Sequence, residues 1–117
     1  MVTISNDKGS IRIATDVFTS LVGAAAVKCF GVRGMAMRSM SDGLVHLLKR
    51  EVMGKGVKVT CDEDGTISIE LHIIVKTGVN LPAICNSIIN EVRYKVTKDT
   101  GVEVKAVDVY IDSIMPD

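Results

Sequence analysis

The residues from 57 to 75 alternate between apolar and polar side chains around a short acidic turn. Two runs of this alternation, 57–61 and 67–75, flank the sequence Asp62-Glu63-Asp64-Gly65, which is typical of a hairpin turn. Alternation with a period of two places the apolar residues of a strand on one face. The pattern therefore predicts a β-hairpin that buries one face of a sheet and leaves the other toward water or a partner.

Two stretches have the apolar spacing of an amphipathic helix. The first is expected to begin with Thr15 as its N-cap and to end near Gly31, and the second to run from an N-cap at Asn80 to a stop at Gly101. Pro82 stands in the first turn of the second helix, where its missing N–H costs nothing. Because each stretch has a single apolar stripe, we expect both helices to pack on one face of the sheet.

Shorter strands are expected at 2–5, 11–13 and 32–38, and a last strand over 102–111. The alternation of this last strand shifts by one residue near Lys105 and Ala106, which predicts either a β-bulge or a strand that begins only there.

The segment between the third strand and the hairpin is expected to hold a short helix capped by Ser41 or Asp42. Its apolar positions would be Leu44, Val45, Leu48 and Val52.

The length of the second helix fixes the topology. A helix of about 19 residues spans roughly 28 Å and returns the chain to the start of a strand, so the last strand should run parallel to residues 66–76 with a right-handed crossover. The hairpin itself is antiparallel, so the sheet is mixed. We therefore predict an α+β fold, a two-layer sandwich in which two long helices cover one face of a three- to four-stranded sheet. The whole chain, residues 1–117, is expected to form one domain.

The net charge of zero hides an uneven distribution. Residues 28–58 hold seven basic and two acidic residues, a balance of +5, whereas residues 59–117 hold five basic and ten acidic residues, a balance of −5. Such segments attract each other between copies, or the basic one meets an anionic partner. Two solvated faces of unlike sign are the plainer interpretation.

The candidate chemical groups do not form a known motif. Cys29, Cys61 and Cys85 have no C-x-x-C spacing, and His46 and His72 have no metal-ligand spacing, so we expect reduced thiols, no metal and no cofactor. The sequence has no Walker, Rossmann or nucleophile-elbow motif, so catalysis is not expected. No apolar run approaches the ~18 residues of a membrane span, and the N-terminus lacks signal-peptide features. A cytoplasmic protein without direct membrane insertion is expected.

The uncovered sheet face is the first candidate interaction surface. RNA-binding sheets need two or three aromatic rings and a basic surround, but this face has one ring, Tyr110, between Asp108 and Asp112, so nucleic acid is not expected to bind it. Its predicted members are Lys58, Thr60, Ser68, Glu70, His72, Ile74, Asp108, Tyr110 and Asp112.

A second candidate is the sequence Gly31-Val32-Arg33-Gly34, which matches the G-x-x-G loop of KH nucleic-acid-binding domains. Arg33, Arg38 and Lys55 would then contact the nucleic acid. A KH loop joins two helices, whereas this motif leads into a predicted strand, and a helix stop followed by a turn is the favoured interpretation.

Several motifs follow one another in a fixed order over nearly the whole chain. They are Ile11-Arg12-Ile13, Val17, Gly23-Ala24-Ala25-Ala26, Gly31-Val32-Arg33-Gly34-Met35, Gly56-Val57-Lys58-Val59, Thr100-Gly101-Val102-Glu103-Val104 and Val107-Asp108-Val109. This ordered set resembles the alkaline shock protein family, which belongs to the envelope stress response of Gram-positive bacteria.

The resemblance implies a non-enzymatic protein of the cytoplasm, held near the membrane through an anchoring partner and associated with cell-envelope or alkaline stress homeostasis. No catalytic residue is carried over. We expect an interaction or scaffold protein that self-associates into a homo-oligomer or docks a membrane-anchoring protein. Contact regulation of a metabolic enzyme stays open as an alternative.

Overall fold

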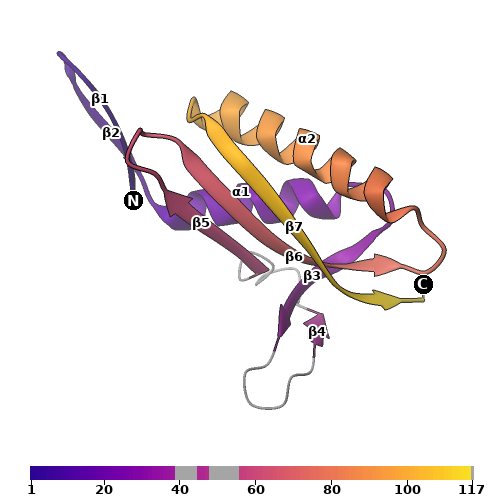
Figure 1. Cartoon of the computed structure of the whole chain (residues 1–117). Helices are drawn as coiled ribbons and strands as arrows, with labels where there is room; N and C mark the ends of the chain where they lie inside the picture. Colours follow the sequence, from indigo (N-terminus) through magenta and orange to yellow (C-terminus); the bar gives the residue numbers. More distant parts are fainter. Residues whose placement is uncertain (39–44, 48–55, 117) are drawn as a thin grey trace.

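The computed structural model describes residues 1–38, 45–47 and 56–116 of the chain (Figure 1). The elements, in chain order, are β1 (Val2–Asn6), β2 (Gly9–Ile13), α1 (Thr15–Val27), β3 (Val32–Arg38), β4 (Val45–Leu47), β5 (Val57–Cys61), β6 (Ile67–Lys76), α2 (Leu81–Thr100) and β7 (Val104–Met115).

Strand β6 is the centre of a five-stranded mixed sheet. Strand β7 runs parallel to β6 along its whole length, as the length of α2 predicts. The other edge of β6 is shared, because β5 pairs with its first half and β3 with its second half, both antiparallel. Strand β4 extends the sheet beyond β3. The predicted mixed sheet is confirmed, with one strand more than expected.

The point where β5 and β3 meet on β6 has no room for a side chain. Gly56 immediately precedes β5, and a Cβ atom at this position would lie 2.8 Å from the carbonyl oxygen of Ala36 and 3.3 Å from that of His72. Backbone atoms cannot move aside as the end of a flexible side chain can, so glycine is the residue that fits this junction.

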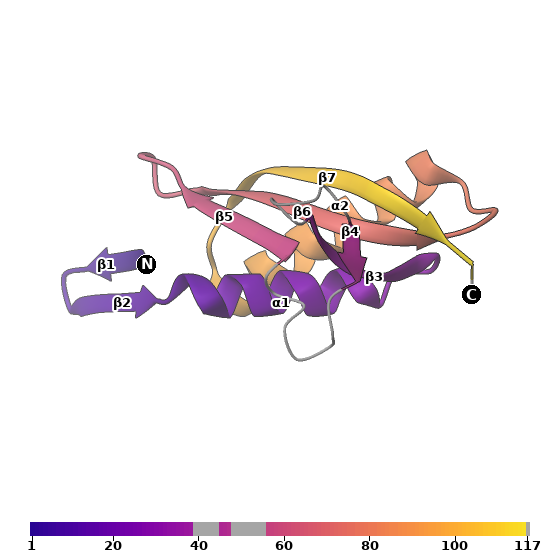
Figure 2. The same ribbon diagram turned by 90° about the horizontal axis from the view of Figure 1, so that it is seen from below.

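Both helices bury their apolar stripes against the same face of the sheet, which confirms the two-layer α+β architecture. Helix α1 lies along this face in Figure 2. The fully buried side chains of the core cluster come from both helices, β3 and β6: Phe18, Val22, Met35, Ile67, Leu71, Ile73, Val75, Ile88, Val92 and Val96. The core is therefore built mainly from aliphatic residues, in line with the 3% aromatic content of the chain.

The ends of the helices follow the sequence signals in one case and depart from them in the other. The side chain of Asn80 accepts a hydrogen bond of 3.0 Å from the backbone N–H of Ala83, and Gly101 adopts φ +74° after the last turn of α2. Helix α1 is confirmed, but its predicted ends were wrong, because Ala14, not Thr15, is the N-cap and the helix ends at Val27. Gly31 does adopt a left-handed φ, but in the turn that follows the helix.

The predicted bulge in the last strand is confirmed. Val104 pairs with Ile67 and Ala106 with Ser68, so Lys105 is the extra residue. A second shift occurs further along, where Asp112 is the extra residue between the partners of Ile73 and Ile74.

The prediction of a short helix between β3 and β5 was wrong for the residues of this segment that the structure describes. Residues Val45–Leu47 form strand β4, antiparallel to β3. A short apolar run fits a helix and a strand equally well, and here the free edge of β3 offers backbone hydrogen bonds to an extended segment. The rest of the predicted helix, 41–44 and 48–53, lies outside the described residues.

The first two strands form a separate two-stranded hairpin that projects from the body at one end (Figure 1). Only its base joins the core, through Val2, which is 6% exposed, and through the partly buried Ile4 and Ile13.

Candidate interaction surface

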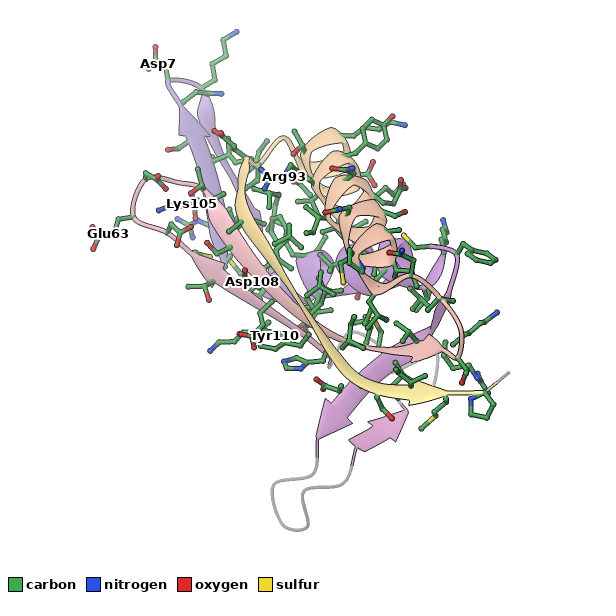
Figure 3. The ribbon with its side chains drawn as sticks, turned by 45° about the vertical axis from the view of Figure 1, so that its right-hand side comes forward. Asp7, Glu63, Arg93, Lys105, Asp108 and Tyr110 are labelled. Carbon is green, nitrogen blue, oxygen red and sulfur yellow. The ribbon has the colours of Figure 1, made fainter. Side chains whose placement is uncertain are left out.

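The sheet face opposite the helices carries a ladder of polar side chains from β5, β6 and β7. Because β6 and β7 are parallel and in register, Glu70 lies beside Asp108, and His72 beside Tyr110. We call this surface the β6–β7 face. Figure 3 shows Asp108 and Tyr110 on β7. Its members are Lys58, Thr60, Ser68, Glu70, His72, Asp108, Tyr110 and Asp112.

The centre of the β6–β7 face is a stacked pair of rings. The His72 and Tyr110 ring centroids are 4.7 Å apart with an angle of 14° between the planes. His72 Nδ1 lies 3.0 Å from the nearer carboxylate oxygen of Asp112, and Nε2 lies 3.3 Å from Glu70. Asp112 keeps only 9% of its side chain exposed. Both ring nitrogens of His72 are thus engaged, so this residue holds the Tyr110 ring in place rather than offering a free base.

Beside the ring stack, the carboxylate of Glu70 on β6 lies opposite that of Asp108 on β7. Glu70 pairs with Lys58 of β5 on one side and with Asp108 of β7 on the other. These three residues, with Thr60 and Ser68, line a small hollow of about 110 Å³. Like charges that lie opposite each other destabilise a sheet, and a basic partner group would relieve this repulsion.

The thiols do not supply a reactive group near this face. Burial raises the pKa of the Cys29 and Cys85 thiols, which lowers their thiolate fraction at neutral pH. Cys61 is exposed at the end of β5. Within residues 1–38, 45–47 and 56–116, no group of three or more His, Cys, Asp or Glu side chains is placed to hold a metal ion.

The acidic hairpin turn is explained by its own hydrogen bonds. The Thr66 hydroxyl donates to Asp64 at 2.6 Å and lies 3.2 Å from Asp62, whose carboxylate also accepts from Ser68 at 2.9 Å. The carboxylates therefore close the turn between β5 and β6, as the sequence predicts.

One predicted member of the uncovered face is placed differently. Ile74 has no exposed surface, although it follows the polar residues of β6 in alternation. It pairs with Gly34 of β3 and Ser113 of β7, and it lies outside the core cluster beneath the helices. Ala36 is also fully buried and outside that cluster. The prediction that Ile74 is available for contact was wrong, because its side chain has no exposed surface in this part of the far face.

Two of the three basic residues of the second candidate site lie on β3. Arg33 is exposed near the start of β3, where it is the extra residue between the paired Val32 and Gly34. Arg38 ends β3, and Lys55 lies outside the described residues. The Gly31–Gly34 motif joins α1 to β3 and not to a second helix. The backbone therefore does not support the KH interpretation. It supports the other interpretation, a helix stop followed by a turn.

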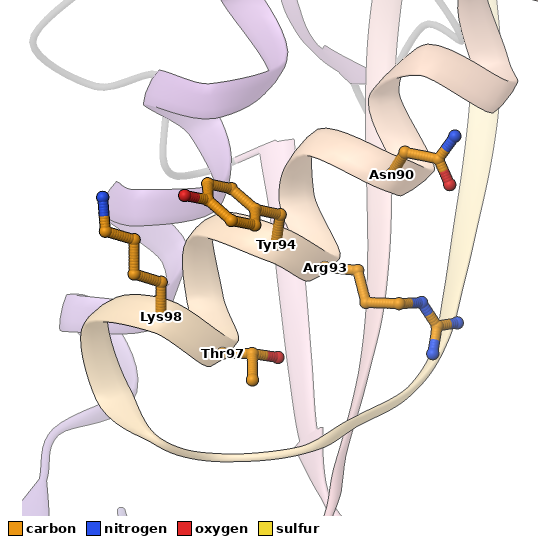
Figure 4. Close-up of a pocket in the computed structure, with 5 residues that line it drawn as sticks. All are labelled: Asn90, Arg93, Tyr94, Thr97 and Lys98. Atoms are coloured by element: carbon orange, nitrogen blue, oxygen red, sulfur yellow. The ribbon is translucent and has the colours of Figure 1, made fainter.

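Two exposed aromatic residues were not singled out from the sequence. Phe30 is 88% exposed in the turn after α1, and Tyr94 is 60% exposed on the outer side of α2. Figure 4 shows Tyr94 with Lys98, whose Nζ lies 5.7 Å from the ring centroid, and with Arg93. The available signal was that Tyr94 lies off the apolar stripe of α2 and that Phe30 lies beyond the apolar stripe of α1.

Comparison with known proteins finds relatives but no structural template. The chain is 33% identical over 107 residues to the uncharacterized protein YloU of Bacillus subtilis, covering 91% of this chain and 88% of that protein. It is 32% identical over 114 residues to the uncharacterized protein Spy1614 of Streptococcus pyogenes, covering 97% of this chain and 93% of that protein. No solved structure matches the chain.

Neither described helix combines the length and apolar character needed to cross a membrane. Residues 3–116 match the model of the alkaline shock protein 23 family, which is described as having a cell envelope-related function. The match spans nearly all of the sheet and both helices. The chain therefore belongs to the alkaline shock protein 23 family.

Proposed function

We propose that this protein acts by contact and not by catalysis, as a scaffold of the cell envelope that self-associates or docks a membrane-anchored partner through the β6–β7 face. The observation that carries the proposal is Tyr110, which is 46% exposed and stacks on His72. A ring already held by its neighbours loses little conformational entropy on binding, and tyrosine is enriched at interface hot spots.

The charge of the β6–β7 face defines the chemistry of its partner. Glu70, Asp108 and Asp112 outnumber Lys58 around the ring stack, so the face is acidic. It fits a surface with basic groups around an apolar site for the Tyr110 ring. The basic segment 28–58 of a second copy offers such groups, and so does a basic segment of a membrane-anchored protein.

The family description supports the cellular setting of this proposal. A cell envelope-related function agrees with docking near the membrane, and the role in envelope or alkaline stress homeostasis is part of the proposal. Both helices and the core are committed to the opposite face of the sheet, which leaves the β6–β7 face to partners.

Size-exclusion chromatography with light scattering tests self-association. We expect species larger than a monomer at about 50 mM salt and their partial dissociation at about 500 mM, because surface charge attraction is screened. Tyr110→Ala should weaken assembly about 30-fold, as the loss of a hot-spot side chain does. Tyr94→Ala is the matched control, since it removes a tyrosine from α2 that is even more exposed, at 60%, and it should leave assembly unchanged.

Crosslinking followed by pull-down from the native host tests the membrane-anchored partner. We expect the wild-type chain to capture an envelope protein and the Tyr110→Ala variant to lose it. A chain that remains monomeric at high concentration and captures no envelope protein would contradict the proposal. If the Tyr94→Ala control lost assembly or capture to the same extent, we would place the contact on α2 and not on the β6–β7 face.

A further inference from the structure

Three connections of the chain gather at one end of the molecule, opposite the β1–β2 hairpin (Figure 1). They are the α1–β3 turn, the β6–α2 loop and the end of β7. Backbone hydrogen bonds join them, since the N–H of Lys76 donates to the carbonyl of Gly31 at 2.9 Å and the N–H of Thr77 to that of Met115 at 3.2 Å. We call this surface the Phe30 end and define it as residues 27–34, 75–84 and 113–116.

Phe30 projects from this end. At 88% exposure, it is the most exposed large apolar side chain in the described part of the chain. Its position is set by the next residue, because Gly31 adopts φ +90° and packs directly against α2, where a Cβ atom would lie 2.5 Å from Ile84 Cδ1. The turn is thus fixed beneath Phe30 and holds the ring outward. A single exposed apolar residue is ordinary, whereas a contiguous exposed apolar patch marks a contact site, so the neighbours of Phe30 decide the interpretation.

The surroundings of Phe30 are partly apolar. The ring lines a hollow of about 490 Å³ together with Val79, Ala83 and Ile84. Ile114, at the end of β7, is also 53% exposed.

The charged residues of the Phe30 end all have one sign. Its described residues include Lys28, Arg33 and Lys76, but no aspartate or glutamate. The opposite end holds the acidic hairpin turn with the exposed Glu63 (Figure 3). The molecule is 52 Å long, so these surfaces of unlike charge are well separated.

A second cluster of aromatic and basic residues, Arg93, Tyr94 and Lys98, lies on α2 and differs in the charge around it. There Arg93 donates a 2.7 Å hydrogen bond to the carbonyl of Val104, and Lys95 forms a 3.1 Å ion pair with Asp99. Glu91 lies on the same helix. The cations of this cluster are partly balanced within the protein. At the Phe30 end, the charge of Glu91 acts on Cys29. The exposed Lys28 and Arg33 are the cations that a partner can contact there.

We propose that the Phe30 end adsorbs to an anionic phospholipid bilayer. Phe30 would enter the boundary between headgroups and acyl chains, while Lys28 and Arg33 would contact the headgroups. A bilayer accepts a projecting ring without a preformed pocket. The acidic turn of a second copy offers charge but no apolar receptor for the ring, and its carboxylates already accept hydrogen bonds from Thr66. The membrane is therefore the favoured occupant.

This proposal goes beyond the proposed function, because it assigns a lipid bilayer to the Phe30 end, whose Lys28 and Arg33 belong to the basic segment 28–58, and not a protein partner to the β6–β7 face. It also amends the expectation of no direct membrane insertion, since a side chain enters the interface and no segment spans the bilayer. The family's cell envelope-related function agrees with such a surface.

Sedimentation of the full chain with lipid vesicles tests the proposal. We expect binding to vesicles of phosphatidylglycerol and phosphatidylcholine, no binding to phosphatidylcholine alone, and release by salt. Phe30→Ser should weaken binding at least about tenfold, and Lys28→Gln and Arg33→Gln about fivefold each. Tyr94→Ser and Lys98→Gln, which change the same residue types on α2, should bind as the wild type does.

A second readout uses the absence of tryptophan from the chain. Phe30→Trp introduces a single fluorescent reporter, whose emission should shift to the blue with phosphatidylglycerol vesicles. Because Phe30 is exposed, these substitutions should leave the circular dichroism spectrum unchanged.

The outcomes separate the two proposals. Absence of wild-type binding, equal binding to neutral vesicles, or equal binding by Phe30→Ser would overturn membrane adsorption. If Phe30→Ser abolished assembly in light scattering while no vesicle bound, the occupant would be a second copy and the membrane proposal would fail. Tyr110→Ala should lose assembly or partner capture but keep vesicle binding, so the failure of one proposal leaves the other intact.

Discussion

The two faces of β6 differ in what they contribute, although they belong to one strand. Ile67, Ile69, Leu71 and Ile73 are at most 2% exposed beneath the helices. Ser68, Glu70 and His72 alternate with them on the other face and keep part of their surface accessible. Burial of apolar surface is the dominant favourable term in folding, so the first set holds the fold together. The second set adds less stability and leaves groups that a partner can contact.

The far face is itself divided into two parts. Over β5, β6 and the first half of β7 it is polar and accessible, but at Ile74 it is closed. Strand β6 therefore has one apolar face along its whole length and a second apolar position only where β3 lies beside it. Contact with a partner is limited to the accessible part, and substitutions should distinguish the two parts by their cost in stability.

The largest effect is expected from Leu71→Ala on the covered face. This substitution leaves a cavity in the core and should lower the free energy of unfolding by about 2–5 kcal/mol. His72→Ala, at the next position, removes one ring of the stack and the hydrogen bonds to Asp112 and Glu70, and should cost about 1–2 kcal/mol. Urea unfolding followed by circular dichroism measures both. Equal losses in the free energy of unfolding would mean that the two faces of β6 contribute equally to stability, contrary to what their burial indicates.

Ile74→Ala tests the closed part of the far face. Because Ile74 has no exposed surface, we expect a loss of about 2–4 kcal/mol in the free energy of unfolding, close to that of a core residue. Ile114→Ala removes the same atoms from a side chain that is 53% exposed and should change stability by about 0.5 kcal/mol or less. A cost for Ile74→Ala as small as that of Ile114→Ala would show that this part of the face is open in solution.

The sequence predicts those features that depend on neighbours along the chain. Alternation defines the covered face of β6, the Asn80 and Gly101 signals define the ends of α2, and the phase shift defines the bulge at Lys105. Each of these features is determined by a window of a few consecutive residues. The parallel pairing of β7 also follows, because helix length and chain connectivity limit the alternatives.

Features that depend on distant segments were not predictable in the same way. Ile74 is fully buried on the face that alternation assigns to the polar side chains, so its burial depends on tertiary packing that alternation does not reveal. Residues 45–47 pair with the edge of β3, a contact that a short apolar run does not specify. The exposure of Phe30 follows from the packing of Gly31 against Ile84, which are 53 positions apart in the sequence. The polar members of the β6–β7 face were predicted because they share the alternation of the covered face.

The smallest effect is expected at the hairpin turn, which belongs to neither face of β6. The Thr66 side chain and backbone N–H donate hydrogen bonds to Asp64, and they hold the pKa of this exposed carboxyl below its usual value of 3.8. A carboxyl whose pKa is lowered by folding stabilises the folded state above its unfolded pKa, and this contribution is lost as the pH falls through the lower, folded value. Asp64→Asn should therefore slightly lower the urea midpoint at neutral pH, and the difference from wild type should shrink as the pH falls below about 3.8. Glu63→Gln removes the same charge at the adjacent exposed position and serves as the control. A difference that grew on acidification would reverse the sign of this linkage and would show that the hydrogen bonds of the turn do not favour the charged form of Asp64.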